Sequence, residues 1–305
     1  QARAAAALAS TRPLVVVEGA AGAGKTTMLG AAIRAAGQEG RSVRVVTPTK
    51  KAADVAAAEL GVPTDSVAAL VYDHGFRWNA DGVWTRLAVG DTDPVTGATY
   101  RGPAKENRLA AAERVVVDEA GMLDQDTALA LLTVADEAGA TLALVGDRAQ
   151  LPAVGRGGVL DIAAALVPRV YSLTSLHRFA DSDYAQLTLA LRTGRDPAEL
   201  FDRLHALGLV RLHEDTEALR AAVAAERIDG AAITAATNDE ARELNTLIRE
   251  DRVRAGAVDD ARTIDGADGL SIGAGDLIQT RRNDSEMGVA NRQTWIVQHV
   301  SGDGS

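Results

Sequence analysis

The chain has no cysteine, and aromatic residues make up only 3% of its 305 residues. Without cysteine it can form neither a disulfide bridge nor a thiolate metal site, which suits the reducing cytoplasm where we expect it to act. With so few aromatic residues, the cores must be built from valine, leucine, isoleucine and alanine. No apolar stretch approaches the roughly 18 residues of a membrane span, and no signal peptide is visible, so we expect no membrane partner.

Positive charge is also in short supply. The formal net charge is −10, which argues against a protein that simply coats nucleic acid, because such proteins are usually basic. It does not exclude a protein that grips one strand through a narrow local groove, since the field depends on where the charges lie. The length is sufficient for two domains, each with its own core.

Short apolar runs alternate with alanine- and leucine-rich stretches through the first part of the chain. Several of the runs are continuously apolar, which is typical of strands buried on both faces in a parallel sheet. The alternation predicts a doubly wound α/β domain. The predicted strands are residues 14–18, 43–47, 114–118, 141–146 and 169–173. The predicted helices are residues 27–38, 51–60, 124–139 and 158–166.

The pattern is interrupted between residues 72 and 103, where Trp78, Trp84 and Tyr100 are found. We predict that residues 84–89 pair with 98–101 in a β-hairpin inserted at about residues 78–103. A surface insertion without regular structure is the alternative. A second block follows, with a strand at 231–236, a helix at 239–255 and a β-rich stretch at 276–300. We therefore expect one domain at 1–174 and a second, partial domain at 175–305.

The strand at 14–18 leads directly into residues 19–26, which read Gly-Ala-Ala-Gly-Ala-Gly-Lys-Thr, and then into a helix. This is the context of a phosphate-binding P-loop, whose backbone N–H groups and helix N-terminus attract phosphate oxygens. Lys25 would reach the β- and γ-phosphates, and the Thr26 hydroxyl would hold Mg²⁺. The sequence thus predicts a nucleoside triphosphate site. Its residues are Gly19, Ala20, Ala21, Gly22, Ala23, Gly24, Lys25, Thr26 and Thr27.

Two further strand ends carry polar residues. Asp118 and Glu119 follow the apolar run 115–117, where Asp118 can hold Mg²⁺ and Glu119 can accept a proton from the attacking water. The alternative for this pair is an ordinary helix N-cap. Gln150, in the stretch 144–152, is a candidate sensor of the γ-phosphate or of water, because its amide can both donate and accept. Its alternative is a turn closed by Asp147 and Pro152.

Together these three motifs resemble motifs I, II and III of superfamily 1 helicases, in the order and spacing of the RecD-like branch. Residues 47–53 are similar to motif Ia, and residues 173–179 to motif IV. Gln1 resembles the adenine-reading Q motif. Residues 233–238 and 275–284 resemble the second RecA-like domain of that branch. The inserted segment looks most like that of actinobacterial conjugative relaxase-helicases of the MobF type.

The resemblance implies a P-loop fold with two RecA-like domains and an ATP- and Mg²⁺-dependent motor on single-stranded DNA. It implies 5′ to 3′ movement, with the inserted hairpin splitting the duplex at a junction. Gln1 would read adenine, and Arg178 would be an arginine finger acting with Lys25, Glu119 and Gln150. The implied DNA-binding residues are Thr47, Pro48, Thr49, Lys50 and Asn238.

The chain departs from that family in two ways. Motifs V and VI are not found before Ser305, and the five histidines are too scattered for the metal site of a relaxase domain. We therefore expect a piece of a longer relaxase-helicase that hydrolyses ATP slowly by itself. The alternatives are a nucleotide-dependent DNA-binding or recruitment module without unwinding activity, and another P-loop phosphotransferase.

Overall fold

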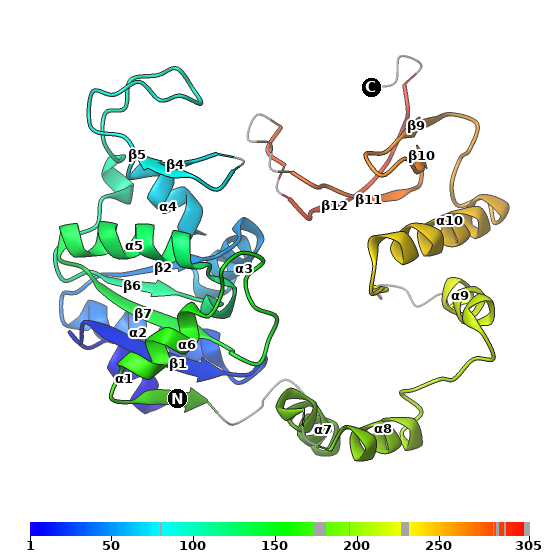
Figure 1. Cartoon of the computed structure of the whole chain (residues 1–305), viewed down its shortest axis with the longest axis horizontal. Helices are drawn as coiled ribbons and strands as arrows, with labels where there is room; N and C mark the ends of the chain where they lie inside the picture. Colours follow the sequence, from blue (N-terminus) through cyan, green and yellow to red (C-terminus); the bar gives the residue numbers. More distant parts are fainter. Residues whose placement is uncertain are drawn as a thin grey trace. The chain divides into compact units, whose positions relative to one another are not determined.

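The computed structural model describes residues 1–79, 81–173, 181–194, 196–226, 232–282, 284, 287–289 and 291–301. The chain divides into two compact units, residues 1–195 and 196–305, which are described separately (Figure 1). The domain boundary predicted between residues 174 and 175 falls outside the described residues, and the assignment of two RecA-like domains stays a prediction.

The first unit is built on a six-stranded sheet with the order β3-β2-β6-β7-β1-β8, and all of its strand pairs are parallel. The register places Val16 beside Leu144 and Val45 beside Val116. This sheet confirms the predicted α/β P-loop fold class. Its strands are β1 Leu14–Gly19, β2 Val43–Thr47, β3 Thr64–Ser66, β6 Arg114–Val117, β7 Thr141–Gly146 and β8 Val170–Leu173.

Helices cover both faces of this sheet, because alternate strand residues belong to two separate cores (Figure 1). On β1, Val15 and Val17 pack against α1 and α2, whereas Val16 packs against the opposite layer of α4, α5 and α6. This explains why the strands read as continuous apolar runs. The helices are α1 Ala2–Leu8, α2 Lys25–Gln38, α3 Lys50–Leu60, α4 Val67–Asp73, α5 Gln125–Ala138 and α6 Val159–Leu166.

One charged side chain is buried inside the sheet. The Arg114 guanidinium, at the start of β6, donates hydrogen bonds to four backbone carbonyl oxygens, those of Leu8, Ser10, Arg12 and Leu142. Burial lowers the pKa of Arg114 to about 10. A planar guanidinium with five donors can satisfy this many acceptors at once. It thereby fixes the connection between α1 and β1, the strand that leads into residues 19–26.

The inserted segment does contain a β-hairpin, but the predicted pairing of residues 84–89 with 98–101 is wrong. β5 (Trp84–Arg86) pairs antiparallel with β4 (Phe76–Trp78) instead. The Asn79 side chain accepts hydrogen bonds from the backbone N–H groups of Asp81 and Val83, which forms a tight turn. Because a short loop costs less entropy to close than the longer one through residues 90–97, the nearer strand becomes the partner.

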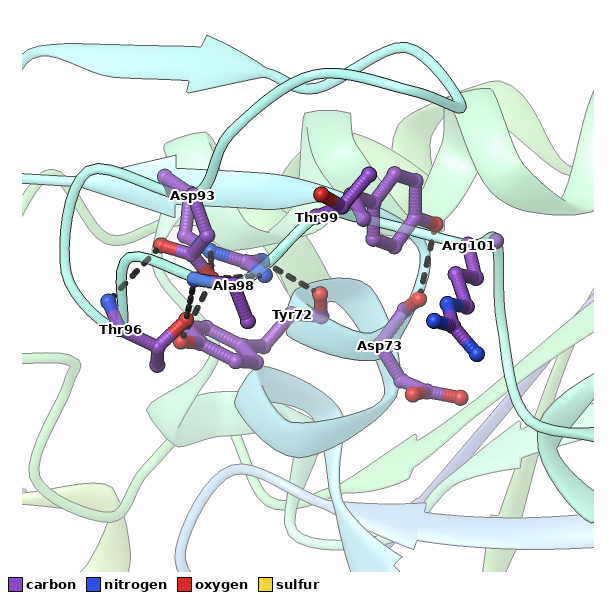
Figure 2. A pocket seen from close by; sticks show the side chains of 10 residues that line it. Tyr72, Asp73, Asp93, Thr96, Ala98, Thr99 and Arg101 are labelled. Atoms are coloured by element: carbon purple, nitrogen blue, oxygen red, sulfur yellow. Dashed lines mark hydrogen bonds and ion pairs between the residues drawn. The ribbon is translucent and has the colours of Figure 1, made fainter.

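The rest of the insertion is held by a buried ion pair. The Arg77 guanidinium donates to Asp93 at 3.0 and 2.8 Å and stacks 3.5 Å above the centre of the Tyr72 ring. Asp93 also accepts from the backbone N–H groups of Val95 and Thr96, and the side chains of Asp93 and Thr96 line a surface pocket (Figure 2). The segment is thus an ordered part of the unit in its described residues, which excludes the alternative of an insertion without structure.

The first unit also includes α7 (Ser182–Thr193). In the second unit, the helices are α8 Pro197–Ala206, α9 Thr216–Ala225 and α10 Asn238–Arg254, and the strands are β9 Thr263–Asp265, β10 Ser271–Gly273, β11 Leu277–Gln279 and β12 Thr294–Ile296. These strands form two antiparallel pairs, β9 with β10 and β11 with β12.

The strand predicted at residues 231–236 is not formed in its described part. Residues 232–236 lead irregularly into Thr237, the N-cap of α10, and no described strand pairs with them. A strand requires a hydrogen-bonded neighbour, so an apolar run without one stays irregular. Among the described helices, none combines the length and the apolar character needed to cross a bilayer.

Candidate active site

The turn between β1 and α2 has the shape that the glycine spacing predicts. Gly22 and Gly24 adopt left-handed backbone conformations, with φ of 77° and 80°. Residues with a side chain rarely adopt this region. Gly24 is the N-cap of α2 and makes no side-chain cap hydrogen bond, so the first N–H groups of the helix have no capping side chain to which they could donate. A helix terminus of this kind attracts an anion through its N–H groups and its dipole.

Lys25 follows as the first residue of α2 and is buried. Its Nζ lies 3.1 Å from Glu119 Oε1. Nevertheless, no described group makes an aligned hydrogen bond with this nitrogen, which has almost no solvent contact. A buried ammonium group without hydrogen-bond acceptors is unfavourable, and phosphate oxygens would supply them. This orphaned donor fits a nucleotide phosphate.

The two acidic residues at the end of β6 are brought to the same place. The Asp118 amide still donates to Val46 O at 2.9 Å, and the Asp118 Oδ1 atom accepts from the Glu119 amide at 3.0 Å. Glu119 itself has φ of 55°, in the left-handed region. Non-glycine residues held in this conformation are often found at functional sites. The strand end therefore positions Asp118 and aims Glu119 at Lys25.

Burial and, next to it, the charge of Glu119 raise the pKa of Asp118 to about 6, against the opposing effect of Lys25. A divalent cation would relieve this crowding of negative charge. Among the described residues, no group of three or more His, Cys, Asp or Glu side chains is arranged to hold a metal ion by itself. Mg²⁺ usually takes one or two protein oxygens together with phosphates and water, so Thr26 and Asp118 fit such an ion only with bound nucleotide.

Thr26 has a partner that the sequence did not reveal. Its Oγ1 donates a hydrogen bond of 2.9 Å to Glu59 Oε2, on the last turn of α3. The charge of Glu59 also contributes to the raised pKa of Asp118. No sequence motif marks Glu59, because it is one of many charged residues on an amphipathic helix. Only the packing of α3 against α2 brings it to this site.

The loops after β6 and β7 contact each other directly. A Cβ atom on Gly121 would lie 2.8 Å from the Asp147 carbonyl oxygen, and one on Gly146 would lie 2.9 Å from the Gly121 nitrogen. Only glycine allows this approach without displacing backbone. Gln150, in the second of these loops, is exposed. Its backbone N–H group donates a long hydrogen bond of 3.4 Å to Asp147 O. The predicted sensor is thus near the site edge but unconstrained.

Asp147 is buried and held by Arg192 of α7, which the sequence analysis did not identify. Arg192 Nη2 donates to Asp147 Oδ1 at 2.6 Å and to Glu18 Oε1 at 3.1 Å. Burial raises the pKa of Asp147, but the hydrogen bonds from Arg192 and the Ala149 amide, together with the charges of Arg192 and Lys25, outweigh this effect and hold the pKa below its usual value. Arg148 pairs with the other oxygen of Glu18. A glutamate within the otherwise apolar β1 run was the available signal for this network.

The remaining predicted residues are distributed more widely. Gln1 Nε2 donates to Ala23 O at 3.2 Å, so this side chain does lie against the turn of residues 19–26. Thr27 is exposed on α2, and Asn238 is exposed at the start of α10 in the second unit. Arg178 lies outside the described residues.

The residues predicted to bind DNA follow β2. Thr47 is buried, and its hydroxyl donates to Thr49 O, while Thr49 caps α3 by accepting from the Ala52 amide. Pro48 is half-buried between them. Lys50 is exposed and forms ion pairs with Asp54 and Asp65. Burial lowers its pKa, but these two carboxylates outweigh that effect and raise it.

Three solved helicase structures resemble this chain weakly. The Bacteroides sp Pif1 structure in complex with ADP-AlF4 has 16% identity and a TM-score of 0.47, over 100% of this chain and 72% of that one. The PRRSV helicase has 21% identity and a TM-score of 0.31, over 58% of this chain and 33% of that one. The Arterivirus nonstructural protein 10 helicase with DNA has 19% identity and a TM-score of 0.34, over 61% of this chain and 41% of that one. All three TM-scores are below 0.5.

This chain spans only about a third of the length of the PRRSV helicase and about two fifths of the length of the Arterivirus helicase. No curated protein matches the sequence. A family model, AAA_30, described as an AAA domain, matches residues 1–215. That match includes the whole six-stranded sheet and every polar strand end described above. The chain therefore belongs to the AAA domain family.

Proposed function

We propose that the chain is the ATP-binding motor core of a DNA helicase, which couples ATP hydrolysis to movement along single-stranded DNA. The observation that carries this proposal is the buried Lys25, which has no aligned hydrogen-bond acceptor and lies 3.1 Å from Glu119. The arrangement offers a cation to a terminal phosphate and a carboxylate to the water that attacks it. A protein that only stored a nucleotide would have no use for the second group.

Each residue near the turn then has a chemical task. Lys25 and the amides of residues 19–27 hold the phosphates. Thr26 and Asp118 hold Mg²⁺, which neutralises phosphate charge when bound. Glu119 orients and deprotonates the attacking water, and Gln1 reads the adenine. When phosphate oxygens reach Lys25, its attraction for Glu119 weakens, which frees this carboxylate to act as a base.

Two further residues would complete the reaction. Gln150 senses the γ-phosphate, and its exposed, unconstrained loop can adjust to the nucleotide. Arg178 approaches the transferred phosphoryl group and stabilises its developing charge. Such an arginine contributes about 10³–10⁵ in rate in enzymes that use one. Closure that brings Arg178 into place would therefore be coupled tightly to hydrolysis.

The track runs past residues 47–50, with Asn238 as a further contact. Lys50 would exchange its carboxylate partners for a phosphate of the strand, and the exposed Thr49 would contact the backbone beside it. Because Thr49 also caps α3, a strand bound here acts on the start of a helix whose last turn contacts Thr26.

We further propose that the protein is the RecD-like helicase part of a larger, cytoplasmic MobF-type relaxase-helicase that moves 5′ to 3′. The hairpin of β4 and β5 would separate the duplex at the junction. Its Trp78 and Trp84 rings stack 4.8 Å apart across the two strands, which stiffens it. A rigid hairpin can act as a wedge, whereas a loose one would bend away.

Phosphate release from ATP, measured with increasing single-stranded DNA, tests the proposal. We expect DNA to accelerate release and Lys25→Ala to abolish it, with Lys105→Ala, an exposed lysine outside both the turn and residues 47–53, as the control. Binding of ATP and DNA without any hydrolysis would favour a recruitment module instead. Transfer of phosphate to a small acceptor, unaffected by DNA, would favour another phosphotransferase.

A further inference from the structure

The last turn of α3 places a carboxylate beside the hydroxyl group that is proposed to hold Mg²⁺. Glu59 Oε2 accepts the Thr26 hydroxyl hydrogen at 2.9 Å. A threonine hydroxyl has one hydrogen and two lone pairs. When the hydrogen points to Glu59, both lone pairs point elsewhere and are free to coordinate a cation. The contact therefore presets the hydroxyl in the orientation that a metal ligand needs.

The charge of Glu59 strengthens this effect. A hydroxyl that donates to a carboxylate becomes a better electron donor to a cation, in the way that second partners raise the basicity of metal ligands. The described contacts of Asp118 do not include the Thr26 hydroxyl, so Asp118 leaves this orienting task to Glu59. Glu59 is also exposed, which leaves room for the water molecules that Mg²⁺ retains.

We propose that Glu59 is a positioning residue of the Mg²⁺ site, which orients the Thr26 hydroxyl toward the metal without binding the metal itself. This inference rests on the proposed function, because it assumes a Mg²⁺-nucleotide at residues 19–26. It adds a third carboxylate to a site to which the motifs contribute only Asp118 and Glu119.

The position of Glu59 on α3 gives the contact a further consequence. Thr49 caps the start of this helix, and Lys50 is its first residue. Glu59 lies nine residues later, about 13 Å along the axis at 1.5 Å per residue. One helix thus carries a proposed DNA contact at its first turn and the proposed metal-positioning group at its last. A strand that shifts the start of α3 would alter the Thr26 contact directly.

The test is to measure the affinity for a fluorescent ADP analogue in EDTA and over a series of MgCl₂ concentrations. The variants are Glu59→Ala and Glu59→Gln, with Glu39→Ala as the control. Glu39 is an exposed glutamate at the other end of α2 that pairs with Arg41. We expect affinity in EDTA to be unchanged in all of them. In Glu59→Ala, the MgCl₂ concentration that gives half the maximal effect should rise about 10-fold or more.

Glu59→Gln should fall between wild type and Glu59→Ala, because its amide oxygen still accepts the Thr26 hydrogen while the charge is lost. Direct Mn²⁺ binding, followed by electron paramagnetic resonance, should give the same order. Unchanged Mg²⁺ dependence in Glu59→Ala would overturn the inference, as would tighter metal binding, which would make Glu59 a competitor for Thr26. If the wild-type chain binds no nucleotide under any condition, the proposed function fails together with the inference.

Discussion

Lys25 Nζ and Glu119 Oε1 lie 3.1 Å apart and form an ion pair. The proposed reaction requires these two side chains to separate. The strand end of β6 holds Glu119 in a left-handed conformation, and α2 begins with Lys25 at the turn after β1. The two opposite charges offset each other at this distance, although Lys25 has no aligned hydrogen bond. In the proposed mechanism, phosphate would displace Glu119 from Lys25, so nucleotide binding and preparation of the base would be one event.

Glu119→Gln should therefore keep ATP bound and stop its hydrolysis. The amide cannot deprotonate water, so we expect phosphate release to fall by about 100-fold or more. ATP should bind as tightly as to wild type or more so, since the competing carboxylate charge on Lys25 is gone. A fluorescent ATP analogue measures the affinity, and phosphate release measures turnover. Normal turnover in this variant would remove Glu119 as the base.

Asp118→Asn should stabilise the chain in the absence of Mg²⁺ and nucleotide. The folded pKa of about 6 is above the usual value near 3.9, so the folded state binds this proton more tightly than the unfolded state. At pH 7.5 the carboxylate is charged and unfavourably buried, and its replacement should gain about 3 kcal/mol. The gain should disappear as the pH falls through 6 toward 4, where wild type is protonated.

Thermal or urea unfolding at pH 7.5, 6 and 4.5 measures this difference. The comparison of the two chains at each pH removes the contribution of the other titrating groups, which they share. If Asp118→Asn were the less stable chain at pH 7.5, the burial of an uncompensated charge at the end of β6 would be contradicted.

Gly121→Ala should destabilise the first unit. The added Cβ would lie 2.8 Å from the Asp147 carbonyl oxygen, so the loops after β6 and β7 would have to move apart. We expect a loss of about 1–3 kcal/mol in the free energy of unfolding. Gly37→Ala is the matched control, because its Cβ meets nothing within 4 Å and it lies in α2. That change should be neutral or stabilise by up to about 1 kcal/mol. Equal effects of the two would contradict the close approach.

Arg192→Ala should loosen α7 from the first unit. It would leave the buried Asp147 carboxylate without its cation. We expect a loss of about 2 kcal/mol, less than for fully buried pairs because Arg192 is partly exposed. Hydrogen exchange should show faster exchange of the α7 amides. Arg192→Lys should recover only part of the loss, since an ammonium cannot reproduce the bonds to both Asp147 and Glu18. Unchanged exchange in α7 would contradict this anchoring role.

Strong local patterns allowed most of the first unit to be predicted. Its five predicted strands are confirmed because each contributes apolar residues to both cores, as with Val15, Val16 and Val17, although β8 at the sheet edge is only partly buried. The β3 strand was missed because its residues 64–66 are polar and lie at the sheet edge. The predicted partner of the strand that begins at residue 84 was wrong, because the Asn79 side chain favours the shorter turn between β4 and β5.

The residues of the candidate site likewise fall into those that the sequence predicted and those that it did not. The motifs located Lys25, Thr26, Asp118 and Glu119, because strand ends in a parallel sheet meet at one edge. Glu59 and Arg192 could not be found, since each reaches the site through the packing of a whole helix rather than through a motif. Their partners are distant in sequence, and no spacing rule connects them.

The affinity for fluorescently labelled single-stranded DNA, measured at low salt with and without a non-hydrolysable ATP analogue and Mg²⁺, tests the central claim most directly. Low salt is needed because phosphate contacts weaken steeply as ions are added. We predict that the nucleotide changes the DNA affinity and that Lys25→Ala removes this change while leaving the nucleotide-free DNA affinity as in wild type. DNA affinity that is the same with and without bound nucleotide would contradict a coupled motor.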